Sequence, residues 1–190
     1  MVKLNAALAL GMKGDRAGVP VFTEIIFDVA DKNVSRQMRI AAANMLKDLK
    51  EKTSIKTFLK LIPDIDADIR NIALTALSVL IEKNDKSSIP VLKETLSWSN
   101  NVIRVYSLKA LGKVGDDSVK ADLRKAYRDE DPKIRMAAAE ALAMLGDYGA
   151  LEYLIDTLKA DEGRKDAKET LEKIKAERNK PKPAPAPAIK

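Results

Sequence analysis

The sequence predicts an all-α protein, a solenoid built from about five and a half stacked helix pairs. A basic residue, followed by a small residue three positions later and a leucine seven positions later, recurs six times at intervals of 29 to 36 residues. Shorter apolar i, i+4 pairs lie between these six segments. Aromatic residues make up only 4% of the chain, and the dominant Ala, Leu, Ile, Lys, Asp and Glu favour helices over sheets.

Each recurring segment is interpreted as the second helix, B, of a helix pair. Its basic residues are Lys3, Arg39, Arg70, Arg104, Arg135 and Arg164. The small residues are Ala6, Ala42, Ala73, Ser107, Ala138 and Ala167, and the leucines are Leu10, Leu46, Leu77, Leu111, Leu142 and Leu171. Offsets of three and seven from the basic residue share one helical face, so we expect both positions to pack against a neighbouring helix.

A shorter helix, A, is predicted before all B helices except the first. Its face is marked by pairs spaced i, i+4, namely Phe22 with Ile26, Phe58 with Ile62, Leu92 with Leu96, Leu123 with Tyr127 and Leu154 with Leu158. Pro20 and Pro90 fall in the first turn of this helix, where a missing N–H costs little.

Polar turns are predicted to separate the helices. Asp131 before Pro132 has the pattern of an N-cap followed by proline at the first helical position, and Asp68 and Asn101 are expected in the same capping role. Three glycines, each followed by Asp, indicate the ends of B helices. They are Gly14, Gly115 and Gly146.

The segment 131–147, from Asp-Pro-Lys-Ile-Arg to Leu-Gly-Asp, closely resembles the HEAT-like repeat of phycobilin lyase subunits. The resemblance covers residues 2 to about 175. It implies a right-handed α-α superhelix of the HEAT/ARM type, with the A helices on the convex side and the B helices on the concave side. We expect the solenoid to span residues 1–177 and a Lys/Pro/Ala-rich, disordered tail to span 178–190.

The pattern departs from this repeat in three places. The chain begins with a B helix, Lys50-Glu51-Lys52 replaces a Gly-Asp turn, and Gly163 and Lys168 replace apolar residues in the last repeat, as in a polar end cap. Because the first B helix has no A helix before it, one apolar face of this helix is not covered by its own repeat. Either the sequence is a piece of a longer array, or this face meets a partner or a second copy of the chain.

The composition excludes several kinds of chemistry. The chain has no Cys and no His, which removes disulfides, thiolate and imidazole metal sites, and Ser-His or Cys-His catalysis. The acidic clusters 64–68 and 129–131 lack the glycine and terminal Glu of a calcium loop, so they are interpreted as helix caps. No metal, cofactor, signal peptide or membrane span is expected, and a cytoplasmic location is the default. A single Gln without Cys or His is typical of thermophile proteins.

The net charge of +6 is concentrated at the C-terminal end. Residues 173–190 hold six Lys and Arg and one Glu, which leaves the rest of the chain near neutrality. A basic groove for nucleic acid is therefore not expected in the solenoid, although the tail offers loose contact with phosphates.

Two sets of residues are candidates for a role. Four arginines are expected to pair with acids in adjacent turns and hold the repeats in register, with phosphate or carboxylate binding as the alternative: Arg39, Arg70, Arg104 and Arg135. The concave face is expected to bind a partner through Asn44, Asn71, Thr75, Tyr106, Lys109, Lys113, Glu140 and Met144, with a solvated helix face as the alternative. Trp98 is either an interface anchor or a cover over the edge of the core.

These observations favour a non-catalytic scaffold that binds a protein on its concave B-helix surface. The alternatives are a nucleic-acid-associated protein that uses the basic tail, and an accessory subunit of a heteromeric enzyme. Self-association through the uncovered first helix is a further expectation.

Overall fold

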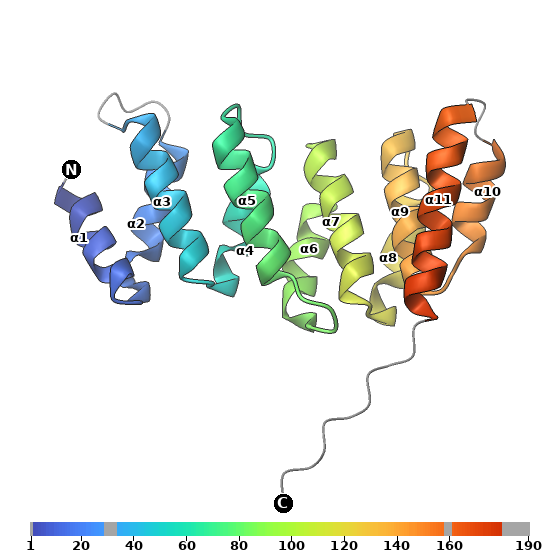
Figure 1. Ribbon diagram of the computed structural model, residues 1–190, viewed down its shortest axis with the longest axis horizontal. Coiled ribbons are helices and arrows are strands. Elements are labelled where there is room, and N and C mark those ends of the chain that lie inside the picture. The colour runs from blue at the N-terminus through green and yellow to red at the C-terminus, as the bar shows by residue number, and fades with distance from the viewer. Residues whose placement is uncertain (1, 29–33, 158–160, 180–190) are drawn as a thin grey trace, which may run out of the picture.

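The computed structural model describes residues 2–28, 34–157 and 161–179 and forms an α-solenoid, which confirms the predicted fold class (Figure 1). The B helices in this part of the chain are α1 (Val2–Met12), α3 (Arg36–Asp48), α5 (Ala67–Leu80), α7 (Asn101–Val114), α9 (Pro132–Met144) and α11 (Asp161–Arg178). The A helices are α2 (Val19–Phe27), α4 (Ile55–Leu61), α6 (Ile89–Thr95), α8 (Lys120–Ala126) and α10 (Gly149–Thr157). The described residues contain no strand.

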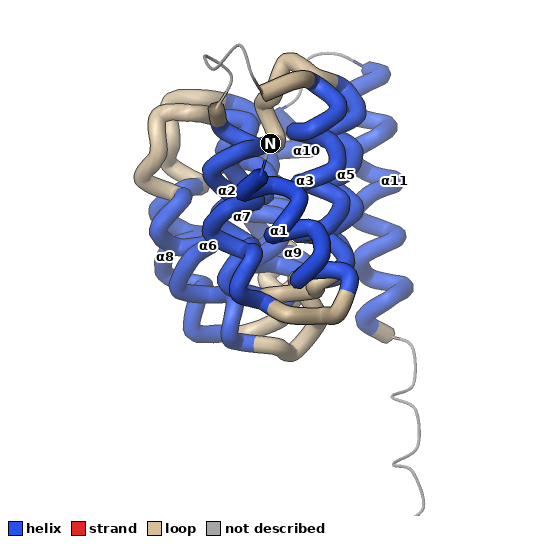
Figure 2. Tube along the Cα trace, turned by 90° about the vertical axis from the view of Figure 1, so that its left-hand side faces the viewer, coloured by secondary structure: helices blue, strands red, loops and turns tan. Residues whose placement is uncertain are grey.

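The helices form two layers, one of A helices and one of B helices. Figure 2 shows α6 and α8 on one side of the molecule and α3, α5 and α11 on the other. Neighbouring B helices mostly pack directly on one another, whereas neighbouring A helices approach one another less closely. A single-turn 3-10 helix precedes four of the A helices, at Arg16–Gly18, Lys52–Ser54, Lys86–Ser88 and Asp117–Val119.

The small residue and the leucine of the recurring motif lie in the core between the layers. In α3, α5, α7 and α9 both positions are at most 1% exposed. In α7 the small residue is Ser107, whose hydroxyl lies 2.6 Å from that of Thr95 in α6. Offset three therefore faces the A helix of the same pair, and its small side chain permits the close approach that the sequence predicted.

Helix α1 departs from this register, and the prediction was wrong for its two motif positions. Ala6 is exposed and Leu10 is 37% exposed. Among the described residues no A helix of its own covers the face that carries these side chains. Ala7 and Gly11 are buried instead, and a Cβ on Gly11 would lie 2.7 Å from Met45 of α3. Helix α1 is thus held by its contact with the following repeat.

The N-caps agree with the prediction at one turn and differ by one or two residues at two others. Asp131 caps α9 by accepting a hydrogen bond from the N–H of Lys133. The caps of α5 and α7 are Asp66 and Asn100, and the expected Asp68 and Asn101 lie within the first helical turn. The capping residue needs an extended backbone, and Asp66 and Asn100 have it, with ψ of 119° and 108°.

A residue with positive φ follows most of the B helices and directs the chain toward the next A helix. Gly14, Gly115 and Gly146 have φ of 74°, 80° and 86°, as expected for glycines that end helices. Lys50 and Asn84 take this position after α3 and α5, with φ of 49° and 66°. Lysine has no local side-chain hydrogen bond to offset the steric cost of this conformation, whereas asparagine adopts it more readily.

We expect Lys50→Gly to raise the free energy of unfolding by about 1 kcal/mol, because glycine adopts a positive φ without a Cβ clash. Urea unfolding followed by circular dichroism measures this change. Gly115→Ala is the matched variant at the same position after α7, and it should lower the stability. A stabilising effect of both substitutions would contradict the steric explanation.

No described helix is both long and apolar enough to cross a lipid bilayer.

Candidate partner-binding face

Two of the four motif arginines bridge consecutive repeats. In α3, Arg39 donates from Nε to the carbonyl of Ile26 at 2.7 Å and from Nη2 to the Asp64 carboxylate at 2.5 Å. In α7, Arg104 likewise donates to the carbonyl of Leu96 and forms an ion pair with Asp129. Each guanidinium therefore ties its own repeat to the turn before the next B helix.

The other two arginines remain within their own turns. Arg70 donates to the carbonyls of Asp64 and Ile65, and Arg135 donates to the corresponding carbonyls of Asp129 and Glu130. Only every second arginine therefore has the expected acidic partner. Arg39 and Arg104 bind a carboxylate of the next turn, whereas Arg70 and Arg135 bind only carbonyl oxygens. Arg104 and Arg135 follow Arg39 and Arg70 by 65 residues, so the pattern repeats every two helix pairs.

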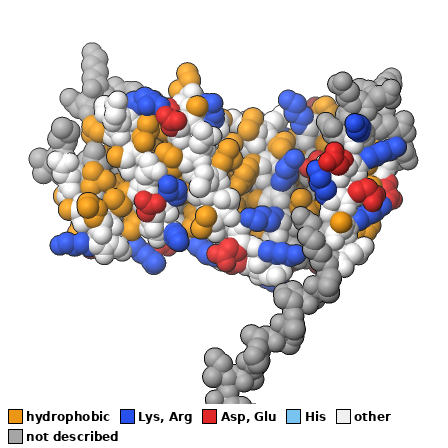
Figure 3. All heavy atoms as spheres, viewed as in Figure 1, with side chains coloured by type: hydrophobic (Ala, Val, Ile, Leu, Met, Phe, Trp, Pro, Cys, Tyr) orange, Lys and Arg blue, Asp and Glu red, His pale blue; other side chains and the backbone are white. Residues whose placement is uncertain are grey.

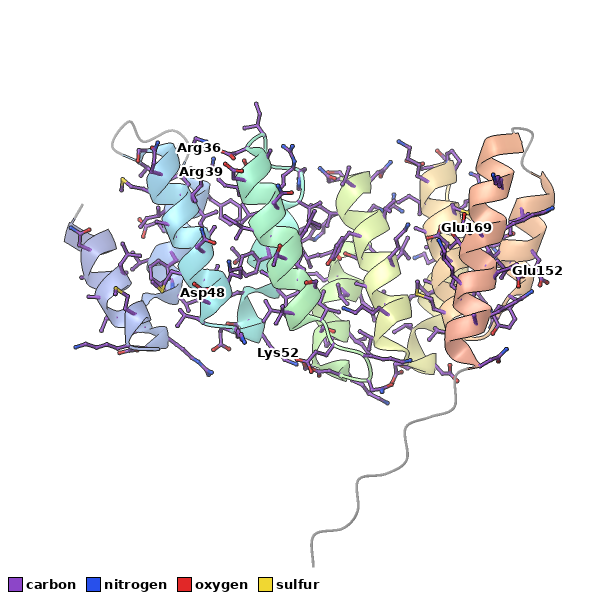
Figure 4. All side chains as sticks on the ribbon, in the orientation of Figure 1. Arg36, Arg39, Asp48, Lys52, Glu152 and Glu169 are labelled. Atoms are coloured by element: carbon purple, nitrogen blue, oxygen red, sulfur yellow. The ribbon has the colours of Figure 1, made fainter. Side chains whose placement is uncertain are left out.

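A second pair of side chains at the same end of the helices follows this two-repeat period. Arg36 forms a 2.6 Å ion pair with Asp66 and also pairs with Asp68, and 65 residues later Asn101 donates to Asp131 at 2.5 Å. The hydrogen bond from Arg36 lowers the pKa of Asp66. Figure 4 shows Arg36 and Arg39 together near one end of α3. The acidic clusters of the sequence therefore serve as caps and as partners of these cationic and amide groups.

A separate row of ion pairs, which was not predicted from the sequence, connects the opposite ends of the helices. Arg16 pairs with Glu51 at 2.9 Å, Lys52 pairs with Asp85, and Lys86 pairs with Asp116 at 2.5 Å. An acidic residue precedes each of the 3-10 turns that begin at Arg16, Lys52 and Lys86. In these three turns the basic residue directly after the acid forms the ion pair with the following repeat. The recurring dipeptides Asp-Arg, Glu-Lys and Asp-Lys at 15–16, 51–52 and 85–86 carry this signal.

Asp116 is the member of this row whose titration has a clear consequence. The ammonium of Lys86 and the hydrogen bonds from Ser118 lower the pKa of Asp116 from 3.8 to about 2. A carboxyl group whose pKa is depressed on folding stabilises the protein above its unfolded-state value and loses that effect as the pH falls through the folded-state value.

We therefore expect the stability difference between the parent chain and Asp116→Asn to be constant above pH 5 or so and to shrink as the pH falls from about 4 to about 2. Urea unfolding at a series of pH values measures it. The amide that this substitution introduces can still accept from the N–H of Ser118, so the difference isolates the charge on Asp116. A difference that is independent of pH over this range would show that the Lys86 pair does not shift the titration.

The structure places the predicted partner-binding residues on the B helices α3, α5, α7 and α9. Asn71, Thr75, Lys109 and Lys113 are exposed, and Asn44, Tyr106, Glu140 and Met144 are half-buried. Burial raises the pKa of Tyr106 to about 12, so this phenol stays neutral at physiological pH. The neighbouring Ile40, Val105 and Met136 are half-buried.

Several of these side chains contact one another across repeats. Lys109 of α7 forms a 2.9 Å ion pair with Glu140 of α9, and Lys113 donates to the carbonyl of Ser78 of α5 at 3.2 Å. The carboxylate of Glu140 thus balances the charge of Lys109 within the fold. Lys113 contacts a carbonyl oxygen and forms no ion pair with an acidic side chain of the described residues.

The B-helix face is uneven in charge. Between Asp68 and Glu82 the exposed side chains of α5 are Asn71, Leu74, Thr75, Ser78 and Val79, none of which is charged. Figure 3 shows hydrophobic side chains in the middle of this face and Lys or Arg side chains beside them over α7. The face therefore combines an apolar and hydroxyl-rich centre with a cationic flank.

Trp98 lies in the turn after α6 and is half-buried. The Nζ atom of Lys60 in α4 lies 5.9 Å from the centre of its ring and equally far from the ring of Phe27. The indole packs against the core, and the ammonium of Lys60 from the preceding repeat forms a cation–π contact with it. These contacts favour the role of a cover over the edge of the core.

Among the residues that the structure describes, no group of three acidic side chains is arranged to hold a metal ion. The Lys/Pro/Ala-rich tail expected at 178–190 lies, beyond Asn179, outside the described residues, and Arg178 ends α11. The side chains of Lys3, Arg164 and Ala167 also lie outside them.

The match to a family of repeat proteins agrees with this architecture. A sequence profile of HEAT repeats matches residues 89–173, which span α6 to most of α11. The complex of CpcE and CpcF of phycocyanin lyase from Nostoc sp. PCC7120 is similar to the chain in structure, with a TM-score of 0.45 and 22% identity over 86% of this chain and 68% of the other. No curated protein sequence matches. Residues 89–173 match HEAT repeats, and the same alternation of A and B helices extends on both sides of them.

Proposed function

We propose that the chain is a non-catalytic scaffold that binds another protein on its B-helix face. The observation that supports this most directly is the surface of α5 after the half-buried Arg70, where no exposed side chain is charged before Glu82, in a chain whose residues are 33% charged. Exposed apolar side chains next to hydroxyl and amide groups are typical of protein interfaces. The four motif arginines whose contacts are described hold repeats and turns together, which favours a structural role over phosphate or carboxylate binding.

The distribution of charge favours a protein partner over a nucleic acid. Phosphate-driven affinity needs several clustered cations, and on this face Lys109 is already paired with Glu140. The absence of His and Cys from the chain is in keeping with a non-catalytic role. An accessory subunit of a heteromeric enzyme would use the same surface, and its partner would then be the catalytic subunit.

Charge reversal of the cationic flank tests the proposal. We expect Lys109→Glu combined with Lys113→Glu to reduce the recovery of the partner from native extract, as measured by affinity purification and quantitative mass spectrometry. Lys125→Glu in α8 combined with Arg128→Glu in the turn that follows α8 changes the charge by the same amount outside the B-helix face and serves as the control. Equal recovery with both double variants would count against the B-helix face. Recovered enzyme subunits would identify the accessory role.

A further inference from the structure

One junction between B helices is more open than the others. Helix α1 packs on α3, α3 on α5, α7 on α9 and α9 on α11, whereas α5 and α7 are the neighbouring B helices that approach each other least closely. At the arginine end of the helices, Arg70 of α5 also stays within its own turn and does not reach the next repeat. We call the junction between α5 and α7 the α5–α7 seam.

The exposure of one residue shows the consequence of this spacing. The position four residues after the motif basic residue is buried in α1, α3, α7 and α9, where it is Ala7, Ala43, Leu108 or Ala139. In α11, the last B helix, it is the exposed Lys168. In α5 this position is Leu74, and it is 40% exposed. Eight residues after the motif basic residue, Gly112 of α7 meets the backbone of α9, whereas Ser78 of α5 is exposed. Leu74 and Ser78 thus line the α5 side of the seam.

Helix α7 provides the opposite side of the seam. Val102 in its first turn is 57% exposed, and one helical turn further along Tyr106 is half-buried. Lys113 lies at the far end of α7, where its ammonium reaches the carbonyl of Ser78. Beyond that end the surface contains an open hollow of about 350 Å³ lined by Asn84, Lys86, Val114, Gly115, Asp116 and Asp117.

We propose that the α5–α7 seam holds an amphipathic helix of the protein partner, with an apolar side chain against Leu74 and Val102 and a carboxylate facing Lys113. This inference rests on the proposed function and names the chemistry of the partner. The partner helix carries an acidic side chain because Lys113 has no acidic partner among the described residues. The side chains that α5 exposes beside the seam are not acidic either.

A helix fits the seam better than an extended strand. The side chains that line the seam recur once per helical turn, as Leu74 and Ser78 do on α5 and Val102 and Tyr106 do on α7. Side chains of a guest helix at i, i+3 and i+4 have the same spacing and interdigitate with such rows. The α-helical edges of the seam are internally hydrogen-bonded, so they offer no row of backbone groups to which a strand could pair.

Selection from a phage-displayed library of random peptides tests the inference without a known partner. The full chain is the bait. We expect the enriched peptides to carry apolar residues at helical spacing together with Asp or Glu, and to gain helical circular dichroism on binding. Fluorescence anisotropy of a labelled enriched peptide should then show affinity at least about tenfold lower for Leu74→Asp and for Lys113→Glu. Gln37→Glu, on the exposed face of α3, is the control and should bind as the parent does.

The outcomes separate this inference from the proposed function. Leu74 and Lys113 are partly or largely exposed, and thermal melts of both variants verify that they fold. Binding that depends on Ile40 of α3 but not on Leu74 would overturn the seam as the site and leave the B-helix face in place. Peptides that bind with no dependence on any B-helix substitution would overturn both. Enrichment of basic peptides, or no enrichment, would contradict the inferred partner chemistry.

Discussion

Leu111→Ala is expected to lower the free energy of unfolding by about 3–4 kcal/mol. The leucine of the recurring motif is fully buried in α7, and truncating it to alanine removes the isopropyl group with all its contacts. The cavity that remains cannot fully close, because the surrounding helix layers are closely packed and relax only in part. Chemical denaturation monitored by circular dichroism measures the loss.

The matched control is Leu10→Ala, which makes the same substitution at the same motif position in α1. Leu10 is 37% exposed, so we expect a loss of about 1 kcal/mol or less. Equal losses at Leu10 and Leu111 would mean that α1 is covered by something in solution, such as a second copy of the chain. Sedimentation of the parent chain would then reveal the larger species.

Arg39→Ala is expected to cost about 2–3 kcal/mol, because it removes one member of a nearly buried ion pair. The Asp64 carboxylate would lose its cation, and the carbonyl of Ile26 would lose its donor, while both are largely shielded from water. Arg70→Ala should cost less, about 1 kcal/mol, because Arg70 donates only to carbonyls of its own turn.

A double-mutant cycle assigns the effect of Arg39 to the ion pair. In an Asp64→Asn background, Arg39→Ala should cost at least about 1 kcal/mol less than in the parent, since the two side chains are coupled. Additive effects of the two substitutions would show that Arg39 acts through the Ile26 carbonyl alone.

The sequence predicted the fold correctly because the repeats impose the same packing constraint many times. Offsets of three and seven from the motif basic residue define one helical face, and in α3, α5, α7 and α9 that face is buried as expected. The register failed in α1, since burial of a motif position depends on the A helix that packs against it, and Leu10 has none among the described residues.

Contacts between repeats were harder to predict. The recurrence of basic and acidic residues near the start of each B helix predicted that motif arginines pair with acids in adjacent turns, as Arg39 does with Asp64, but it did not specify the individual pairs. The row of ion pairs from Arg16 to Asp116 depends on the distance between consecutive 3-10 turns, and helical periodicity does not specify this distance. The α5–α7 seam is likewise a matter of spacing between helices, and the residue type did not indicate it, because the same motif position holds a leucine in α5 (Leu74) and in the closely packed α7 (Leu108).

Photo-crosslinking tests the proposed partner-binding face most directly. A photoreactive residue is placed at Thr75 on the exposed face of α5 or, as the reference, at Ala121 on the exposed face of α8, and the chain is irradiated with its purified partner. A covalent adduct from position 75 and none from position 121 is the predicted result. Adducts from position 121 alone would place the partner on the A-helix layer and contradict the account.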